Sequence, residues 1–312
     1  MRQLATLVGV LVLLAPGLAA GQLQVGVAKA DVTPPPGVRM YGYGARGQNV
    51  STGVHDPLYA KAIVLGDGER TVAWVTMDLG YADKPLTRDV RAAVSAALGF
   101  DDVFLTSSHT HSGPSFVSDF PTTADPWVEE LRRKITAAVV EAHGALQPAR
   151  LGVDWGRVDL GHNRRRVRAD GTVEMFWENR DAVPTSPVDK SVAVVAFDTL
   201  DGDPIATLIN LAIHPVVLGP ENLEYSADYP GAMMALVERQ IGGQAMFLHG
   251  AAGDINPFWD KTPLDEGAYD QMRRMGETAG GEVVRLRREL TFTDVDAIAL
   301  GVELVPVGPR WD

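Results

Sequence analysis

Two short segments place histidines at a spacing that suits metal binding. Ser107 to Pro114 (SSHTHSGP) contains His109 and His111, and Asn210 to Gly219 (NLAIHPVVLG) contains His214. Each histidine follows an apolar run typical of a strand, and open α/β folds bind ligands where such strands end. In extended backbone, residues two apart point to the same side, so the rings of the pair are expected to face one site. Because imidazole is a common metal ligand, we predict that the three rings converge on one ion. Each motif alone also has a structural alternative. His109 and His111 could be a hydrogen-bonded structural pair, and His214 could be a hydrogen-bonded histidine at a sheet edge.

Two other motifs carry polar groups of interest. His249 to Pro257 (HGAAGDINP) follows a strand-like run, and its small residues let backbone amides approach a ligand closely, while Asp254 could orient a histidine. Its alternative is a tight turn that needs small residues for backbone shape. The segment Gly161 to Arg166 (GHNRRR) contains Arg164, which could clamp a carboxylate or carbonyl oxygen, although three consecutive arginines usually form a solvated face.

The composition limits the chemistry. The chain has 312 residues, a formal net charge of −12 and no cysteine. An acidic balance argues against nucleic acid as a partner, because phosphates favour lysine and arginine. Without thiolates, any metal must be held by nitrogen and oxygen, from His, Asp, Glu or Tyr.

The N-terminus has the pattern of a secretory signal peptide. Arg2 precedes an apolar run from Leu4 to Ala15, and small residues follow at Gly17, Ala19 and Ala20. We expect residues 1 to 20 to be removed and the protein to be secreted or periplasmic. The apolar run is short for a membrane span, which needs about 20 apolar residues.

The remaining chain, residues 21 to 312, is expected to form one α/β domain of layered, mixed and partly antiparallel β-sheets flanked by helices. Three hairpins are predicted: one joins Leu58–Leu65 to Thr71–Asp78, one lies within Ser191–Ala212, and a third turns at Asp170 and Gly171. Apolar residues recurring every three or four positions predict the helices, and Gln244–Leu248, Val103–Thr106 and Val295–Val305 have strand character. The helices are expected at Leu86–Leu98, Val128–Val139 after an Asp125 N-cap, Pro230–Gln240 with Asp228 as cap, and Asp265–Leu290.

The motifs occur in an order that resembles a known family. GVAKADVTPP, GYG, GVHDPLYAKA, DLG, SSHTHSGP, HNR, IHP, SADYPG and AAGDINP follow one another as in the N-terminal catalytic domain of neutral/alkaline non-lysosomal ceramidases. The resemblance covers nearly all of the chain after residue 20. It implies a zinc amidase that cleaves the N-acyl bond of ceramide to fatty acid and sphingosine. It further implies that His109 and His214 are zinc ligands, that His111 handles protons or contacts substrate, and that Arg164 contacts substrate or its carbonyl.

The chain departs from the family pattern in two places. The motif corresponding to GDINP carries a serine important for activity in the ceramidases, and the alignment places Asn256 there. An amide is not a nucleophile, but it can donate a hydrogen bond to an oxyanion. The family's other zinc ligands, a glutamate and a tyrosine, lie C-terminal to Asp312, so we expect a domain truncated at its C-terminus. Asp254, His249 or Asp78 could substitute for them.

The predicted mechanism is hydrolysis by water that Zn²⁺ activates, since the ion lowers the pKa of a bound water toward ~7. His111 would relay protons, and Arg164 or Asn256 would stabilise the tetrahedral oxygen. The expected partner is a ceramide-like lipid or another amide, with transient contact to a membrane surface. Alternatives are a hydrolase of another amide or ester, including glycan or phosphate esters, and a non-catalytic secreted lipid-binding module. No oligomeric state is predicted.

Overall fold

The computed structural model describes residues 21–100, 102–116, 126–303 and 306. The predicted signal peptide and the predicted N-cap Asp125 lie outside this part of the chain. The strands are β1 (Gln24–Asp31), β2 (Gly53–Val54), β3 (Tyr59–Gly66), β4 (Thr71–Met77), β5 (Val103–Ser107), β6 (Gln147–Arg157), β7 (Gly161–Asn163), β8 (Arg165–Val167), β9 (Val173–Met175), β10 (Ser191–Thr199), β11 (Pro204–Leu211), β12 (Glu224–Tyr225), β13 (Gln244–His249), β14 (Ile255–Pro257) and β15 (Phe292–Thr293). The helices are α1 (Lys84–Leu98), α2 (Pro126–Gly144), α3 (Asp228–Ile241) and α4 (Ala268–Glu289), with 3₁₀ turns η1 (Gly44–Arg46) and η2 (Leu264–Glu266).

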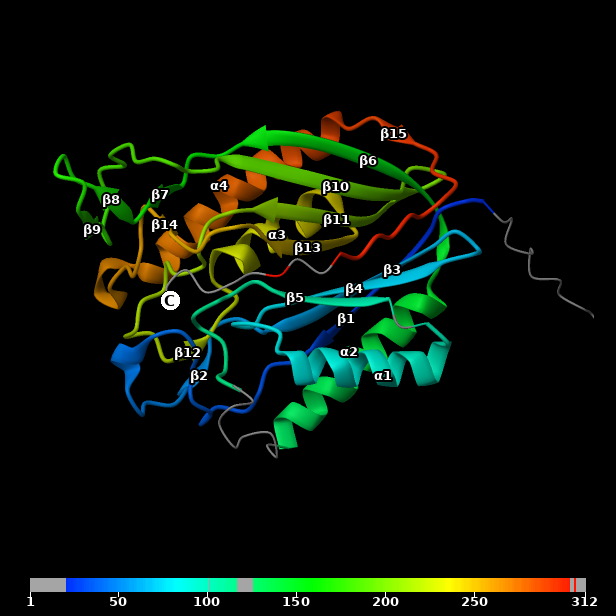
Figure 1. The fold of residues 1–312 in the computed structure, drawn as a ribbon, viewed down its shortest axis with the longest axis horizontal. Helices are drawn as coiled ribbons and strands as arrows, with labels where there is room; N and C mark the ends of the chain where they lie inside the picture. Colours follow the sequence, from blue (N-terminus) through cyan, green and yellow to red (C-terminus); the bar gives the residue numbers. More distant parts are fainter. Residues whose placement is uncertain (1–20, 101, 117–125, 304–305, 307–312) are drawn as a thin grey trace, which may run out of the picture.

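One large mixed sheet folds over on itself to form the centre of the molecule. Its strand order is β13-β11-β10-β6-β1-β3-β4-β5, with β15 paired to β6. Strands β1 and β6 share only two residue pairs, Gln24–Pro148 and Val25–Gln147, so the sheet turns there and its two halves face each other. Helices α1 and α2 cover the half that contains β5, and α3 and α4 cover the half that contains β13 (Figure 1). The predicted fold class, layered mixed α/β with antiparallel pairs, is confirmed.

Three apolar clusters hold these layers together. One lies between α1, α2 and their half of the sheet, and another lies between α3, α4 and theirs. The third fills the space between the two halves and includes Val25, Ile63, Phe197 and Met246. Burying a side chain of this size contributes roughly 1.5–3 kcal/mol before the cost of ordering the chain.

The predicted hairpins and helices form close to the expected residues. Strands β3 and β4 pair antiparallel, as do β10 and β11, and β8 and β9 flank the predicted turn at Asp170 and Gly171. Helix α1 begins after Asp83, whose side chain accepts a hydrogen bond from the amide of Leu86 at 2.7 Å, and it ends at Gly99, whose φ of +81° suits glycine. None of the helices in the described residues is both long and apolar enough to cross a membrane.

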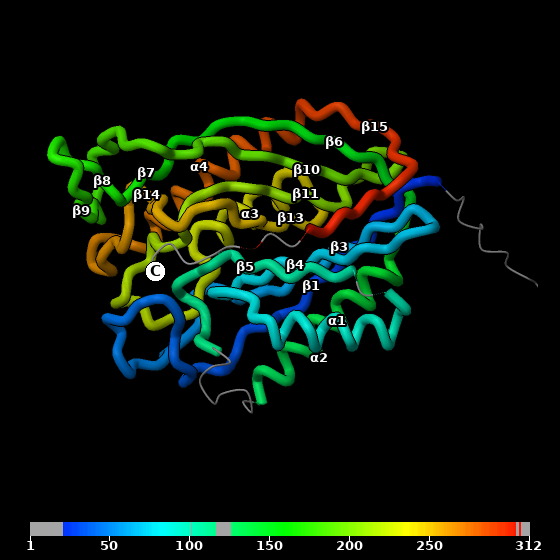
Figure 2. The backbone as a smooth tube through the Cα atoms, in the orientation of Figure 1, coloured from blue at the N-terminus to red at the C-terminus, as the bar shows by residue number. Residues whose placement is uncertain are grey.

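Two predictions about elements are wrong. Asp228 does not cap α3: the N-cap is Ala227, while the Asp228 side chain accepts hydrogen bonds from the amides of Leu218 and Tyr229. The strand expected at Val295–Val305 is not formed over its described part, 295–303. Instead, this segment runs between the two halves of the sheet, where Val295 and Ile298 pack against the apolar core (Figure 2).

Candidate functional site

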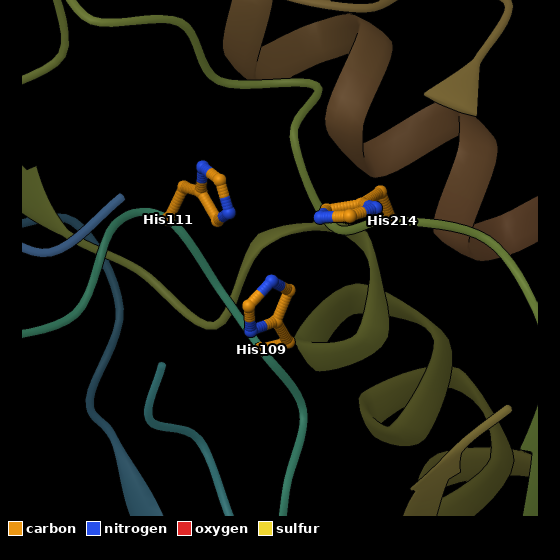
Figure 3. Close-up of side chains that lie close together, drawn as sticks. All are labelled: His109, His111 and His214. Atoms are coloured by element: carbon orange, nitrogen blue, oxygen red, sulfur yellow. The ribbon is translucent and has the colours of Figure 1, made fainter. Parts of the chain in front are cut away.

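Three histidines from two distant segments meet at one end of the sandwich. His109 and His111 follow β5, and His214 follows β11 (Figure 3). One ligand nitrogen from each lies within 4.8 Å of the others, and the ring centroids are separated by 4.8 Å (His109–His214), 5.1 Å (His109–His111) and 5.4 Å (His111–His214). The rings therefore face a common point, as one ion would require.

The backbone reaches this arrangement differently from the extended pair that the spacing predicts. Strand β5 ends at Ser107, and His109 has φ +66°, in the left-handed region that a residue with a Cβ rarely adopts. Such a conformation costs on the order of 1–3 kcal/mol and persists where surrounding contacts impose it. Here the amide of His109 donates to the carbonyl of Leu79 at 3.0 Å. The bend after β5, rather than strand pleating, aims the two rings at one point.

Hydrogen bonds fix which nitrogen of two rings is free. Nδ1 of His109 donates to the carbonyl of Gly80 at 2.7 Å, and Nδ1 of His214 donates to the carbonyl of Ala252 at 2.7 Å. A carbonyl only accepts, so each ring carries its proton on Nδ1 and keeps the lone pair of Nε2 for another partner. Backbone carbonyls that orient histidines in this way are typical of metal sites.

His111 differs because neither of its ring nitrogens has a hydrogen-bond partner, although both are buried. Burial lowers its pKa to about 2, assisted by the nearby His214, His109, Arg46 and Lys261. Burial also lowers the pKa of His214 to about 4. Both rings are therefore neutral at pH 7, the form in which imidazole binds a metal, and the orphaned nitrogens of His111 fit a site that holds an ion or a polar ligand.

Tyr43 of the GYG motif and Tyr41, directly before the motif, form one wall of the site. The rings of Tyr41 and Tyr43 lie 5.5 Å and 4.8 Å from that of His111. Gly42 lies between them, with φ +102°, and a Cβ built on it would be 2.4 Å from Cγ of His111. Only glycine fits at this position, and the motif therefore serves to seat the His111 ring.

Arg46 organises the same region, although the sequence analysis did not select it. The side chain is 4 % exposed, and it donates to the carbonyls of His111 at 2.5 Å, Tyr41 at 2.7 Å and Asn222 at 2.9 Å. It also lies 3.4 Å from the carbonyl of Gly219. Burial lowers its pKa to about 10. Arg46 thus joins three loops around the histidines, and only its position directly after GYGA could have suggested this.

The predicted catalytic residues Arg164 and Asn256 lie together in a second polar cluster. Nη1 of Arg164 donates to Oδ1 of Asn256 at 3.3 Å, and Nδ2 of Asn256 donates to Oδ2 of Asp260 at 2.7 Å. Asp260 also pairs with Lys261, and burial raises its pKa. Arg164 is close enough to the histidines that its charge helps to lower the pKa of His214. Nε of Arg164 and Oδ1 of Asp260 are buried without a partner, so they are the free polar atoms of this cluster.

The three residues considered as substitute ligands lie in different places. His249 lines a cavity of about 500 Å³ together with His109 and His214, with ring centroids at 5.8 Å and 6.1 Å, and its buried Nδ1 has no partner. Asp254 accepts from Nδ2 of Asn163 at 3.2 Å. Asp78 lines another cavity of about 450 Å³ and accepts from the amide of Tyr59. Among the described residues, the donor group that could hold an ion consists of His109, His111 and His214.

Comparison with known proteins gives one consistent result. Residues 23–261 match the model of the family described as neutral/alkaline non-lysosomal ceramidase, N-terminal. Neutral ceramidase A of Dictyostelium discoideum is 26% identical over 258 residues, which cover 75% of this chain and 36% of that protein. The neutral ceramidase of Pseudomonas aeruginosa is 25% identical over 274 residues, covering 80% and 40% respectively. The chain thus spans about two fifths or less of the length of these relatives.

Two solved structures share the fold. The neutral ceramidase from Pseudomonas aeruginosa and a ceramidase complexed with C2 each superpose with a TM-score of 0.71 at 21% sequence identity. The matches cover 85% of this chain and 44% and 43% of those chains. The family match extends over most of the chain and includes all three histidines, so the chain belongs to the neutral/alkaline non-lysosomal ceramidase family, whose N-terminal part it matches.

Proposed function

We propose that this protein is an exported, zinc-dependent amidase that hydrolyses the N-acyl bond of ceramide or a related lipid amide. The observation that carries the proposal is the group of three histidines, His109, His111 and His214, whose ligand nitrogens lie within 4.8 Å of one another, in a chain of the ceramidase family. Its curated relatives are neutral ceramidases, and the lipid substrate is inferred from them.

The donor set suits zinc, which accepts imidazole nitrogen and usually takes three protein ligands in catalytic sites. His109 and His214 would hold the ion through Nε2, because their Nδ1 atoms are engaged with carbonyls. When bound, zinc would polarise the amide carbonyl and lower the pKa of a water molecule. A further ligand would come from His111, which completes the close group, or from residues outside the described part of the chain, whereas His249 lies outside that group.

The remaining groups of the site would transfer the proton and stabilise the oxyanion. His111 has two free nitrogens, so it can accept a proton from water and return it to the departing amine. Arg164 would steady the developing negative charge on the carbonyl oxygen through its guanidinium, of which Nε has no partner. Asn256 already contacts Arg164 and Asp260, and it would hold the Arg164 guanidinium in place.

The export proposal rests on the N-terminal signal pattern, and membrane contact follows from the proposed lipid substrate. A non-catalytic lipid-binding module is the second candidate. The observation in its favour is Asn256, which is 1 % exposed and carries an amide where the resemblance expects a serine important for activity.

The experiment is zinc analysis of the purified protein together with hydrolysis of a panel of N-acyl amides and esters, including ceramide. We expect about one zinc per chain and release of fatty acid from the amides. His111→Ala separates two roles: a proton carrier retains zinc and loses turnover, whereas a ligand loses both. Stoichiometric lipid binding by zinc-loaded protein without any turnover would favour the non-catalytic module, and well-folded protein that binds no zinc would contradict the proposed metal site.

A further inference from the structure

The β8–β9 hairpin lies at the end of the molecule that carries β7 and β14 (Figure 1), and one of its faces exposes apolar side chains to solvent. Val167 pairs directly with Val173, and Arg165 pairs with Met175. Residues two apart on a strand share a face, so these four side chains lie on one side of the hairpin. Val167 is 67 % exposed, Val173 56 % and Met175 44 %. Scattered apolar residues on a surface are ordinary, but a contiguous set on a projecting hairpin indicates an interaction surface.

The charge of the hairpin is opposite to that of the chain. Residues 164–175 contain four arginines, one aspartate and one glutamate, whereas the whole chain has a formal charge of −12. On the other face of the hairpin, Arg166 and Arg168 both pair with Glu174. Arg165, on the apolar face, has no ion pair within the described part of the chain. An arginine beside exposed valines suits a binding surface whose interior is apolar and whose outer layer carries negative charge.

The hairpin is also connected to the proposed site. Trp177, two residues after β9, is 43 % exposed, and its ring lies 5.0 Å from the Arg164 guanidinium and 4.5 Å from Nζ of Lys261. Tryptophan is enriched at membrane–water boundaries because its ring is apolar and its N–H is polar. The same Arg164 contacts Asn256, so the exposed surface and the polar cluster share a residue.

We propose that this apolar face, formed by Arg165, Val167, Val173 and Met175 with Trp177 beside it, docks on a phospholipid surface that contains anionic headgroups. The proposal rests on the proposed function for its lipid substrate. The valines and Met175 would enter the boundary between headgroups and acyl chains, while Arg165 would contact the headgroups. Docking there would bring the neighbouring site to the surface from which a lipid amide is drawn.

The test is co-sedimentation of the full chain with vesicles of phosphatidylcholine alone and of phosphatidylcholine mixed with phosphatidylserine. The chain is expected to bind the anionic vesicles more tightly, and added salt should weaken the binding. Replacing Val167 and Val173 together by Glu should reduce the affinity by roughly 10-fold or more, because two apolar groups are lost and two negative charges are added. Arg165→Glu should remove most of the preference for anionic vesicles.

The matched control is Leu200→Glu, which adds a negative charge at an exposed apolar residue in the turn between β10 and β11. Leu200 lies just before the start of β11, whereas His214 follows the end of that strand. The control therefore lies at the opposite end of β11 from the histidines. It should bind vesicles like the parent chain. Equal binding by the valine variant and the control, or no vesicle binding by the parent chain, would overturn the proposal. So would a dimer in solution that the valine variant dissolves, because the face would then join two copies.

Binding and chemistry are separable in this test. Turnover of a short-chain, water-soluble N-acyl amide should be unchanged in the valine variant, because none of its substitutions touches the histidines. Loss of vesicle binding with retained turnover therefore supports the docking surface, whereas absence of turnover in every protein, with vesicle binding intact, contradicts only the proposed amidase function.

Discussion

The two polar clusters at the site differ in how their polar atoms are hydrogen-bonded. The first cluster is His109, His111 and His214, and the second is Arg164, Asn256 and Asp260. Burial lowers the pKa of His111 and of His214, so these two rings are neutral at pH 7, and the Nε2 atoms of His109 and His214 are left available by the hydrogen bonds of their Nδ1 atoms to carbonyls. In the second cluster, Arg164, Asn256 and Asp260 mainly contact one another. The comparison indicates that the first cluster is arranged for a ligand from outside the chain, whereas the second is held together by its own hydrogen bonds and leaves only Nε of Arg164 and Oδ1 of Asp260 without a partner. Substitutions in the first should therefore change metal binding, and substitutions in the second should change stability and turnover.

The largest effect is expected from removing a ligand nitrogen. His214→Ala should weaken zinc binding more than 100-fold, since even changes to groups that merely orient ligands cost about 10–100-fold. His249→Ala is the matched control, because His249 lines the same cavity but lies outside the close group of three. Competition with a chromophoric chelator measures both affinities. Equal losses in the two variants would break the distinction between His249 and the close group, and would place His249 among the ligands.

The next effect concerns the support of the first cluster. Arg46→Met should lower the free energy of unfolding by about 3 kcal/mol, because the buried carbonyls of Tyr41, His111 and Asn222 would lose a charged donor. Urea unfolding at pH 7 measures it. Arg164→Met is the control and should cost about 1 kcal/mol, since Arg164 is only partly buried and makes one side-chain hydrogen bond, to Asn256. A smaller loss for Arg46 than for Arg164 would contradict the supporting role.

These two arginines also show how far the sequence reaches. The hairpins, the helices and the association of His109 with His214 follow from apolar periodicity and from strands that end at a common rim. The role of Arg46 could not be predicted from the sequence, because it donates to backbone carbonyls, which every residue has, and not to a particular side chain. The bend at His109 was likewise hidden, since it depends on contacts with Leu79 from another strand connection. Local sequence patterns predict helices and strands. Contacts between loops from distant segments form only when the chain folds, so no local pattern predicts them.

A third effect is the pH dependence of stability that His214, in the first cluster, is expected to cause. The pKa of His214 is about 4 in the folded protein, below its usual 6.5, so the unfolded chain binds more protons between these values. Stability of the metal-free protein should therefore fall as the pH decreases from 6.5 toward 4. His214→Gln should reduce that fall by roughly 1.5 kcal/mol between pH 6.5 and 5. Urea unfolding at both pH values, after chelator treatment, gives the slope, and parallel slopes for the two proteins would contradict the desolvated state of His214.

The smallest effect should come from the second cluster itself. Asn256→Ser would remove the contact with Arg164 and shorten the reach toward Asp260, at a cost of about 1 kcal/mol of unfolding free energy. Zinc affinity should stay within about twofold of the parent value, because Asn256 does not belong to the donor group that could hold the ion. Hydrolysis of a soluble N-acyl amide should fall if Asn256 holds the Arg164 guanidinium in place. Weakened zinc binding would mean that the two clusters act as one unit, and the division between an ion-binding group and a hydrogen-bonded support would have to be abandoned.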